Sequence, residues 1–278
     1  MTHQGRPSAL EGRPCVAIDI GGTHTRVSQP SGLRRFKTLP SYGRQLAALV
    51  RVVDGAPEAV GVSFGGRLDP SGSTVRVALN LPGYVGRALR DDLAERWSCP
   101  VRVAHDPVCG LLGEWTAGSL RGAERCAYVT LSTGVGSALR LGPTLLSTEA
   151  GHQLVPGNDR RCVCGQRGCL ETLVGGRALE RLLGRPLEEV DDESFWQQYA
   201  QALAPALANV ALAAGVEAMA LGGSIVLRRP GLFAAIVDAV QRVHKYHPMR
   251  LTLAELGDEA PLVGAAVLVD LPDGLILH

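Results

Sequence analysis

Short apolar runs alternate along the chain with segments in which apolar residues recur at helical spacing. The runs at 15–20 and 59–64 are rich in β-branched residues, and each is followed directly by two glycines, which indicates a buried strand ending in a turn. The segments 42–53 and 86–97 show helical periodicity. Strands that alternate with helices in this way are typical of an α/β protein.

A similar order of elements recurs in the second half of the chain. Strands are predicted at 127–131 and 137–141 around a glycine-rich turn, after a helix at about 106–117. We therefore expect two α/β lobes, with the cleft between them as the default ligand site. The predicted division is a flexible N-terminal tail (1–14), a small lobe (15–104, completed by a C-terminal helix at about 262–278) and a large lobe (105–261).

Composition and charge exclude several classes of partner. The chain has 278 residues and a formal net charge of +1, with 28 basic and 27 acidic residues, so neither nucleic acid nor an anionic membrane is expected to bind. No apolar run approaches the roughly 20 residues of a membrane span. The first 14 residues lack the apolar core of a secretory signal, which predicts a cytoplasmic protein.

Three glycine turns follow predicted strands. In the first, Asp19 precedes Gly21, Gly22 and Thr23; glycines let the backbone approach a phosphate, and the threonine adds a hydroxyl donor. The second contains Thr133, Gly134 and Gly136, and the third Gly222 and Gly223. Ordinary hairpin turns are the alternative. We expect the first two turns to hold the β- and γ-phosphates of a nucleotide and the third to lie against adenosine.

Asp106 lies where a predicted strand meets a helix, directly before Pro107. Asp is a favoured helix N-cap and proline is favoured at the first helical position, so a purely structural role is the alternative. A carboxylate at a helix N-terminus also stays ionised, which suits a base that accepts a hydroxyl proton during phosphoryl transfer.

The most specific local pattern is a cluster of cysteines. His152, Cys162, Cys164 and Cys169 offer the four ligands that a structural zinc ion prefers. A labile disulfide or unpaired thiols are the alternatives. The other cysteines are expected to be buried free thiols; they are Cys15, Cys99, Cys109 and Cys126.

Two carboxylates bracket the cysteine cluster. Glu149 and Glu171, together with the imidazole of His152, are suited to hydrogen-bonding the hydroxyls of a sugar. A solvated polar rim around a metal loop is the alternative interpretation.

These segments, in this order, resemble the ROK family of bacterial sugar kinases and related repressors, from about residue 16 to the C-terminus. The resemblance is strongest in Glu-Ala-Gly-His at 149–152 followed by Cys-x-Cys-Gly-x-x-Gly-Cys-x-Glu at 162–171. The Asp-Ile-Gly-Gly-Thr turn at 19–23, the second turn at 133–136, the Asn-Leu-Pro-Gly-Tyr loop at 80–84 and the closing pattern at 256–266 are also similar to the family's motifs.

The resemblance implies a two-lobed actin/hexokinase-like (ribonuclease H-like) fold, MgATP as phosphoryl donor and a hexose or N-acetylhexosamine as acceptor. It implies Asp106 as catalytic base, zinc at the His152 cluster, and sugar contacts at Asn80, Glu149, His152 and Glu171. Family repressors carry a winged-helix domain before the phosphate turn; only 18 residues precede Asp19 here, so we expect a kinase. A homodimer is expected on family habit alone.

The chain departs from the family pattern beside the base. The family usually has Asn before the catalytic Asp and again two residues after it, whereas this chain has His105 and Val108. His105 is expected to hydrogen-bond a sugar hydroxyl in place of the first Asn. Glucose is the first choice of substrate, with glucose 6-phosphate as product, and N-acetylmannosamine is the second. A sugar-binding protein with weakened catalysis is the alternative of another class. Polyphosphate is a weaker alternative donor, because no strongly basic segment stands out.

Overall fold

The computed structural model describes residues 2–4, 15–272 and 274–277. Its contacts divide into two compact units. Unit 1 extends to Gly118 and includes Thr144–Ser147 and the chain from Glu259, whereas unit 2 comprises Ser119–Pro143 and Thr148–Asp258. None of the helices in the described ranges is long and apolar enough to cross a membrane.

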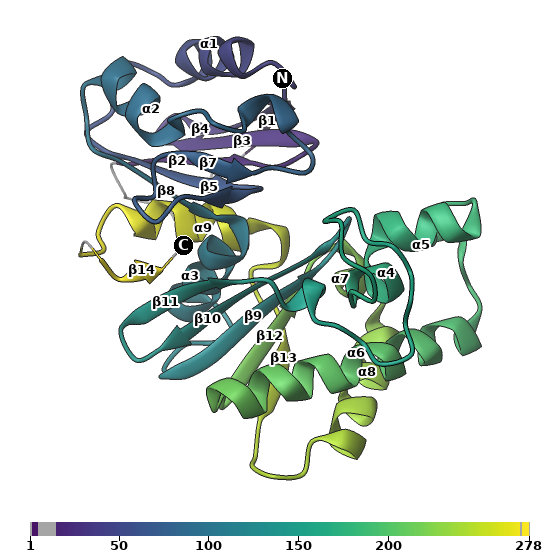
Figure 1. Cartoon of the computed structure of the whole chain (residues 1–278). Coiled ribbons are helices and arrows are strands. Elements are labelled where there is room, and N and C mark those ends of the chain that lie inside the picture. Colours follow the sequence, from purple (N-terminus) through teal and green to yellow (C-terminus); the bar gives the residue numbers. More distant parts are fainter. Residues whose placement is uncertain (1, 5–14, 273, 278) are drawn as a thin grey trace. The chain divides into compact units, whose positions relative to one another are not determined.

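Unit 1 is built on a twisted sheet with the strand order β1-β4-β3-β2-β5-β8 (Figure 1). Strands β2, β5 and β8 are parallel, and β3, β4 and β1 are added antiparallel on one side. The parallel strands are almost wholly apolar and buried, as expected for strands covered on both faces. The bounds are β1 (Thr2–Gln4), β2 (Val16–Ile20), β3 (His24–Gln29), β4 (Gly32–Lys37), β5 (Val60–Phe64) and β8 (Val101–His105).

Helices cover the two faces of this sheet (Figure 1). Helices α3 and α9 lie side by side on one face, and α9 also contacts β2 and β5. The approach of α3 to α9 requires glycine, because a Cβ on Gly264 would collide with the carbonyl oxygen of Cys109. The bounds are α1 (Tyr42–Val52), α2 (Leu89–Trp97), α3 (Asp106–Ala117), α9 (Ala260–Leu268), and the small elements β6 (Arg67–Leu68), β7 (Val75–Val77) and η2 (Pro82–Tyr84).

The structure differs from the sequence-based division in three places. Residues 106–117 were assigned to the second lobe, but α3 packs in unit 1 because its Gly113 lies against Ala260 of α9. In the predicted flexible tail, residues 2–4 form β1, which pairs with β4, while residues 1 and 5–14 lie outside the described residues. Residues 144–147 also join unit 1, where β11 (Thr144–Thr148) pairs in parallel with β14 (Ile276–Leu277).

Unit 2 contains strands in the order β13-β12-β9-β10, with β9 and β10 forming an antiparallel hairpin. Helix α6 begins after Asp192, whose carboxylate accepts hydrogen bonds from the backbone N–H groups of Ser194 and Phe195, and ends at Gly215 in the left-handed conformation. The bounds are β9 (Arg125–Leu131), β10 (Val135–Leu141), β12 (Ala218–Gly222), β13 (Arg250–Leu253), α4 (Glu171–Val174), α5 (Gly176–Leu183), α6 (Glu193–Ala214), α7 (Ser224–Leu227), α8 (Pro230–Val243), η3 (Ala150–His152) and η4 (Leu187–Glu189).

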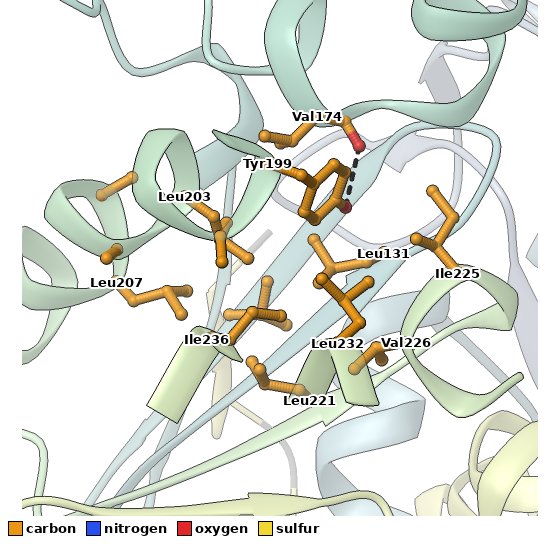
Figure 2. Packing of buried hydrophobic residues seen from close by; sticks show 14 of the residues in the cluster. Leu131, Val174, Tyr199, Leu203, Leu207, Leu221, Ile225, Val226, Leu232 and Ile236 are labelled. Carbon is orange, nitrogen blue, oxygen red and sulfur yellow. Dashed lines mark hydrogen bonds between the residues drawn. The ribbon is translucent and has the colours of Figure 1, made fainter. Parts of the chain in front are cut away.

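The core of unit 2 lies between its strands and helices α6 and α8. Figure 2 shows Leu203 and Leu207 of α6 with Ile236 of α8 and Leu221 of β12 in this core. The hydroxyl of Tyr199, which is buried, donates a hydrogen bond of 3.0 Å to the carbonyl oxygen of Val174, so α6 is also tied to α4. This core holds the β9–β10 turn and the segment before α4 in place.

Candidate active site and metal centre

The parallel strands of unit 1 end together at one edge of the sheet. Ile20, Phe64 and His105 are register partners across β2, β5 and β8. Because each is the last residue of its strand, the turn at 21–23 and the residue Asp106 both start at this edge. Ligands of open α/β sheets bind at this carboxyl edge.

Asp106 is the first residue of α3, and His105 takes the N-cap position. The prediction that Asp106 itself caps the helix is therefore wrong by one residue, because Asp106 already has helical geometry while His105 is extended (φ −57°, ψ 140°). The Asp106 side chain is 39% exposed, and its Oδ1 lies 3.2 Å from Nε2 of His105. An accessible carboxylate at a helix N-terminus can accept a proton from a bound hydroxyl.

Asp19 is held from two sides. Arg26, its register partner on β3, donates from Nη2 and Nε to Oδ2 at 2.7 and 3.1 Å. The hydroxyl of Ser63 donates to Oδ1 at 2.8 Å. Sequence reasoning missed Arg26, although its place in the strand after the turn, seven residues from Asp19, is the pattern of a cross-strand partner.

A buried thiol lies close to both carboxylates. Burial raises the pKa of Cys109 well above its ordinary value, and the negative charges of Asp19 and Asp106 raise it further. Asp19 and Asp106 thus both lie around one buried group of unit 1. The thiol stays protonated and adds no third negative charge there.

A row of cationic side chains adjoins the first turn. His24 and Arg26 of β3 pair with Lys37 and Arg35 of β4, and paired residues share one face of the sheet. We call these four residues the cationic row. Burial, and next the charges of Arg35, Lys37 and Arg26, lower the pKa of His24. The sequence alone did not indicate this row, because its members come from two strands.

Asn80 lies against the first glycine turn. A Cβ on Gly22 would lie 2.8 Å from the Cβ of Asn80, so the glycine permits this contact. The loop of Asn80 is anchored by Tyr84, which is buried and donates a hydrogen bond of 2.7 Å to the carbonyl oxygen of Leu39. The exposed Asn80 amide is therefore held beside residues 21–23.

In unit 2, Glu171 contacts the second glycine turn. Its Oε2 accepts a hydrogen bond of 3.0 Å from the backbone N–H of Val135, and a Cβ on Gly134 would lie 2.6 Å from the same oxygen. Glu149 precedes η3, which is held against β10 by a 2.8 Å hydrogen bond from the Ala150 N–H to the Ser137 hydroxyl. The structure thus places Glu171 and the start of η3, which follows Glu149, against the hairpin that carries the turn at 133–136.

The predicted metal ligands form one cluster. The ligand atoms of His152, Cys162, Cys164 and Cys169 all lie within 4.8 Å of one another. Nδ1 of His152 lies 3.7 Å from Sγ of Cys162, and Sγ of Cys164 lies 3.7 Å from Sγ of Cys169. Three thiols and an imidazole at these separations fit one tetrahedral ion.

The loop that carries the thiols depends on its glycines. Gly165 and Gly168 have positive φ of 97° and 85°, which a residue with a side chain rarely adopts. All seven cysteines are free, so the cluster contains no disulfide. Cys15, Cys109 and Cys126 are buried as predicted, whereas Cys99 is only half-buried.

The three clustered thiols differ in acidity. Burial raises the pKa of Cys162 to about 12. Burial also opposes ionisation of Cys164, but hydrogen bonds from the Gln166 backbone and from the neighbouring thiols outweigh it, and the pKa of Cys164 is lowered. The cluster therefore favours one thiolate first, and a bound dication would have to displace the other protons.

A pocket of about 310 Å³ opens beside the second and third turns of unit 2. Its lining includes Ser132, Thr133 and Ser224. The third turn needs both glycines. A Cβ on Gly222 would collide with the Tyr128 hydroxyl, and a Cβ on Gly223 would collide with the Leu131 carbonyl oxygen. Sequence reasoning missed the other part of the lining, which includes Trp196, Arg228 and Arg229.

A family model described as ROK family matches residues 15–271. The chain belongs to the ROK family. An N-acetylmannosamine kinase from Haemophilus influenzae is 24% identical over 297 residues, covering 94% of this chain and 99% of the relative.

Solved structures of ROK proteins have the same fold. A ROK hexokinase from Thermus thermophilus matches with a TM-score of 0.80 at 29% identity, covering 94% of this chain and 99% of the other. A ROK glucokinase from Streptomyces griseus, in complex with glucose and AMPPNP, matches with a TM-score of 0.78 at 26% identity, covering 91% and 98%. These likenesses confirm the predicted two-lobed actin-like α/β fold, and the chain is an ATP-dependent sugar kinase.

Proposed function

We propose that the protein transfers the γ-phosphoryl group of MgATP to the 6-hydroxyl of a hexose, with glucose as the first candidate and Asp106 as catalytic base. The observation that carries this proposal is the position of Asp106. Its accessible carboxylate follows the same sheet edge as the glycine turn at 21–23. A base beside a phosphate-binding turn is the arrangement that phosphoryl transfer to a hydroxyl requires.

The reaction is an in-line displacement. Asp106 accepts the proton of the sugar hydroxyl while its oxygen bonds to the γ-phosphorus; the bond to the β–γ bridging oxygen breaks, and ADP leaves with that electron pair. Backbone N–H groups of Gly22, Thr23, Thr133 and Gly134 stabilise charge on the phosphoryl oxygens. The N–H groups of Gly21 and Val135 already donate to His24 and Glu171. Both oxygens of Asp19 already accept hydrogen bonds, so we assign Asp19 a contact to Mg²⁺ through water.

We assign the sugar contacts to Asn80, Asp106, Glu149, His152 and Glu171. Nδ1 of His152 faces the thiols, which leaves Nε2 available for a sugar hydroxyl once zinc is held at Nδ1. Zinc would be structural, because His152, Cys162, Cys164 and Cys169 complete its coordination and leave no position for water. Its role would be to fix His152 and the start of α4.

The donor pocket is assigned to unit 2. The pocket beside Thr133, Gly222 and Gly223 would hold adenosine, with the second turn at its phosphates. Polyphosphate stays a second candidate donor, and the cationic row supports testing it, because its exposed members Arg35 and Lys37 lie on one face and can attract phosphates. On family habit we also propose a homodimer located in the cytoplasm.

The acceptor is tested by ATP consumption over a panel of glucose, N-acetylmannosamine, N-acetylglucosamine and fructose. We expect glucose to give the highest kcat/KM and N-acetylmannosamine the next. The relatives named above include kinases of both sugars. Binding of a sugar by calorimetry without ATP consumption would instead support a sugar-binding protein that has lost catalysis.

The base is tested with Asp106→Asn. We expect kcat to fall by about 10²–10⁴-fold, because the amide cannot accept the hydroxyl proton. Zinc content and thermal midpoint should stay at their wild-type values, and Asp191→Asn, an exposed carboxylate of unit 2, serves as the matched control. Wild-type turnover by Asp106→Asn would refute the assignment.

A further inference from the structure

The side chain of His105 bridges two other polar groups of unit 1. Its Nδ1 lies 2.8 Å from the hydroxyl oxygen of Ser147, and its Nε2 lies 3.2 Å from Oδ1 of Asp106. The residue is only 8% exposed, whereas the Asp106 carboxylate is 39% exposed. Half-buried Ser147, buried His105 and accessible Asp106 thus form a hydrogen-bonded chain with the imidazole at its centre.

The direction of these hydrogen bonds follows from the groups involved. An ionised carboxylate only accepts, so Nε2 of His105 must carry the proton in this contact. In the neutral imidazole Nδ1 is then an acceptor, and the hydroxyl of Ser147 donates to it. Ser147 therefore favours the imidazole tautomer that can donate to Asp106.

We propose that His105 is a positioning residue for the catalytic base and that Ser147 selects its tautomer. His105 holds Oδ1 of Asp106 and so fixes the orientation of the carboxylate that accepts the proton of the sugar hydroxyl. This inference rests on the proposed function, because it presupposes Asp106 as base. It replaces the expectation that His105 contacts the sugar, since both ring nitrogens are engaged by side chains of the protein.

The fold explains how the chain is assembled. His105 is the last residue of β8, and its backbone directs the side chain inward while the next residue starts α3. Ser147 comes from β11, 42 residues later, so sequence spacing does not indicate the pair. The donor to Asp106 is Nε2, which lies one bond farther from Cβ than Nδ1 does. A residue at position 105 without a donor at that position could not hold the Asp106 carboxylate, which could then rotate.

The test compares two amides at position 105. The amide nitrogen of glutamine lies as many bonds from Cβ as Nε2 of histidine does. The amide nitrogen of asparagine lies as many bonds from Cβ as Nδ1 does. His105→Gln therefore keeps the donor to Asp106, whereas His105→Asn keeps only a partner for Ser147. We expect kcat to fall about 10-fold or more in His105→Asn and clearly less in His105→Gln, with the sugar KM within about twofold of wild type in both.

Ser147→Ala provides a second variant that does not alter the buried ring. We expect its kcat to fall about threefold to tenfold, because the imidazole loses its tautomer selection. His247→Gln, in the loop that follows α8 in unit 2, is the matched control. All variants are compared by zinc content and thermal midpoint.

The outcomes separate this inference from the proposed function. A rise in sugar KM at unchanged kcat in His105→Asn would overturn the inference and restore a sugar contact, and equal kcat values for the two amides would also overturn it. If Asp106→Asn retains turnover, the proposed function fails instead. Loss of turnover in Asp106→Asn with wild-type kcat in both His105→Asn and Ser147→Ala would refute the positioning role alone.

Discussion

The two glycine turns that follow β2 and β9 are organised by different means. In unit 1 the turn at 21–23 is stabilised by neighbouring strands, because Asp19 is held by Arg26 of β3 and Ser63 of β5. In unit 2 the turn at 133–136 is contacted by Glu171, which lies 36 residues from Val135 in the chain. The first turn therefore depends on sheet register, and the second depends on how the cysteine loop delivers α4.

Because the two turns have separate supports, a defect in one unit should leave the candidate site residues of the other unit in place. Disruption of the cysteine loop should affect Glu149, His152 and Glu171 and leave the Asp19 and Asp106 edge intact. Disruption of the α3–α9 contact should have the opposite effect. Variants that perturb one unit at a time test this independence.

Among variants that perturb one unit, the largest effect is expected from removing one ligand of the proposed zinc site. Cys164→Ser removes an exposed ligand and so avoids a packing defect. We expect the zinc content to fall below half of wild type, the thermal midpoint to fall by roughly 5–15 °C, and the sugar KM to rise about 10-fold or more. Cys99→Ser, a half-buried thiol of unit 1, is the control. Wild-type zinc content and KM in Cys164→Ser would show that the cluster does not support the sugar site.

A smaller effect is expected in unit 1 from Gly264→Ala. The added Cβ collides with the Cys109 carbonyl oxygen, and overpacking of this kind costs about 1–3 kcal/mol. Chemical denaturation should show this loss, with kcat reduced and zinc retained. Gly231→Ala in α8 is matched in kind, since its Cβ meets no atom within 4 Å, and it should not destabilise the protein. Equal stability of the two variants would contradict the close approach of α3 and α9.

The smallest effect is expected from the cationic row. Arg35→Gln combined with Lys37→Gln removes two exposed charges near the first turn. We expect the KM for ATP to rise about twofold to fivefold at low salt, and the difference to vanish at about 1 M salt, because screening removes such interactions. Arg51→Gln at the end of α1 is the control. A difference that persists at high salt would indicate a direct contact instead of a long-range field.

Much of the fold follows from local patterns in the sequence. The helix predicted at about 106–117 occupies Asp106–Ala117, and the strand predicted at 15–20 is β2 (Val16–Ile20). The helix predicted from residue 86 begins instead at Leu89, because Gly86 has a positive φ of 79°. Strands β4 and β11 were not predicted, because both are partly exposed and lack the continuous buried run that marks β2 and β5.

The candidate site, like the fold, was predicted only where its residues lie close together in the sequence. The His152 and cysteine ligands were found because their spacing is local and their chemistry is specific. The contact of Arg26 with Asp19 was missed because it arises from the pairing of β3 with β2. The contact of Ser147 with His105 was missed because it joins side chains 42 residues apart. Residue type alone does not encode such partners.

Helix α9 contacts β2 and β5, and Gly61 of β5 leaves room for the carbonyl oxygen of Ala265. A ribosome therefore releases all of unit 2 before it supplies the helix that completes unit 1. During synthesis β2 and β5 lack their contact with α9, while unit 2 can already pack. Unit 1 therefore gains its complete apolar core only when residues 260–268 emerge.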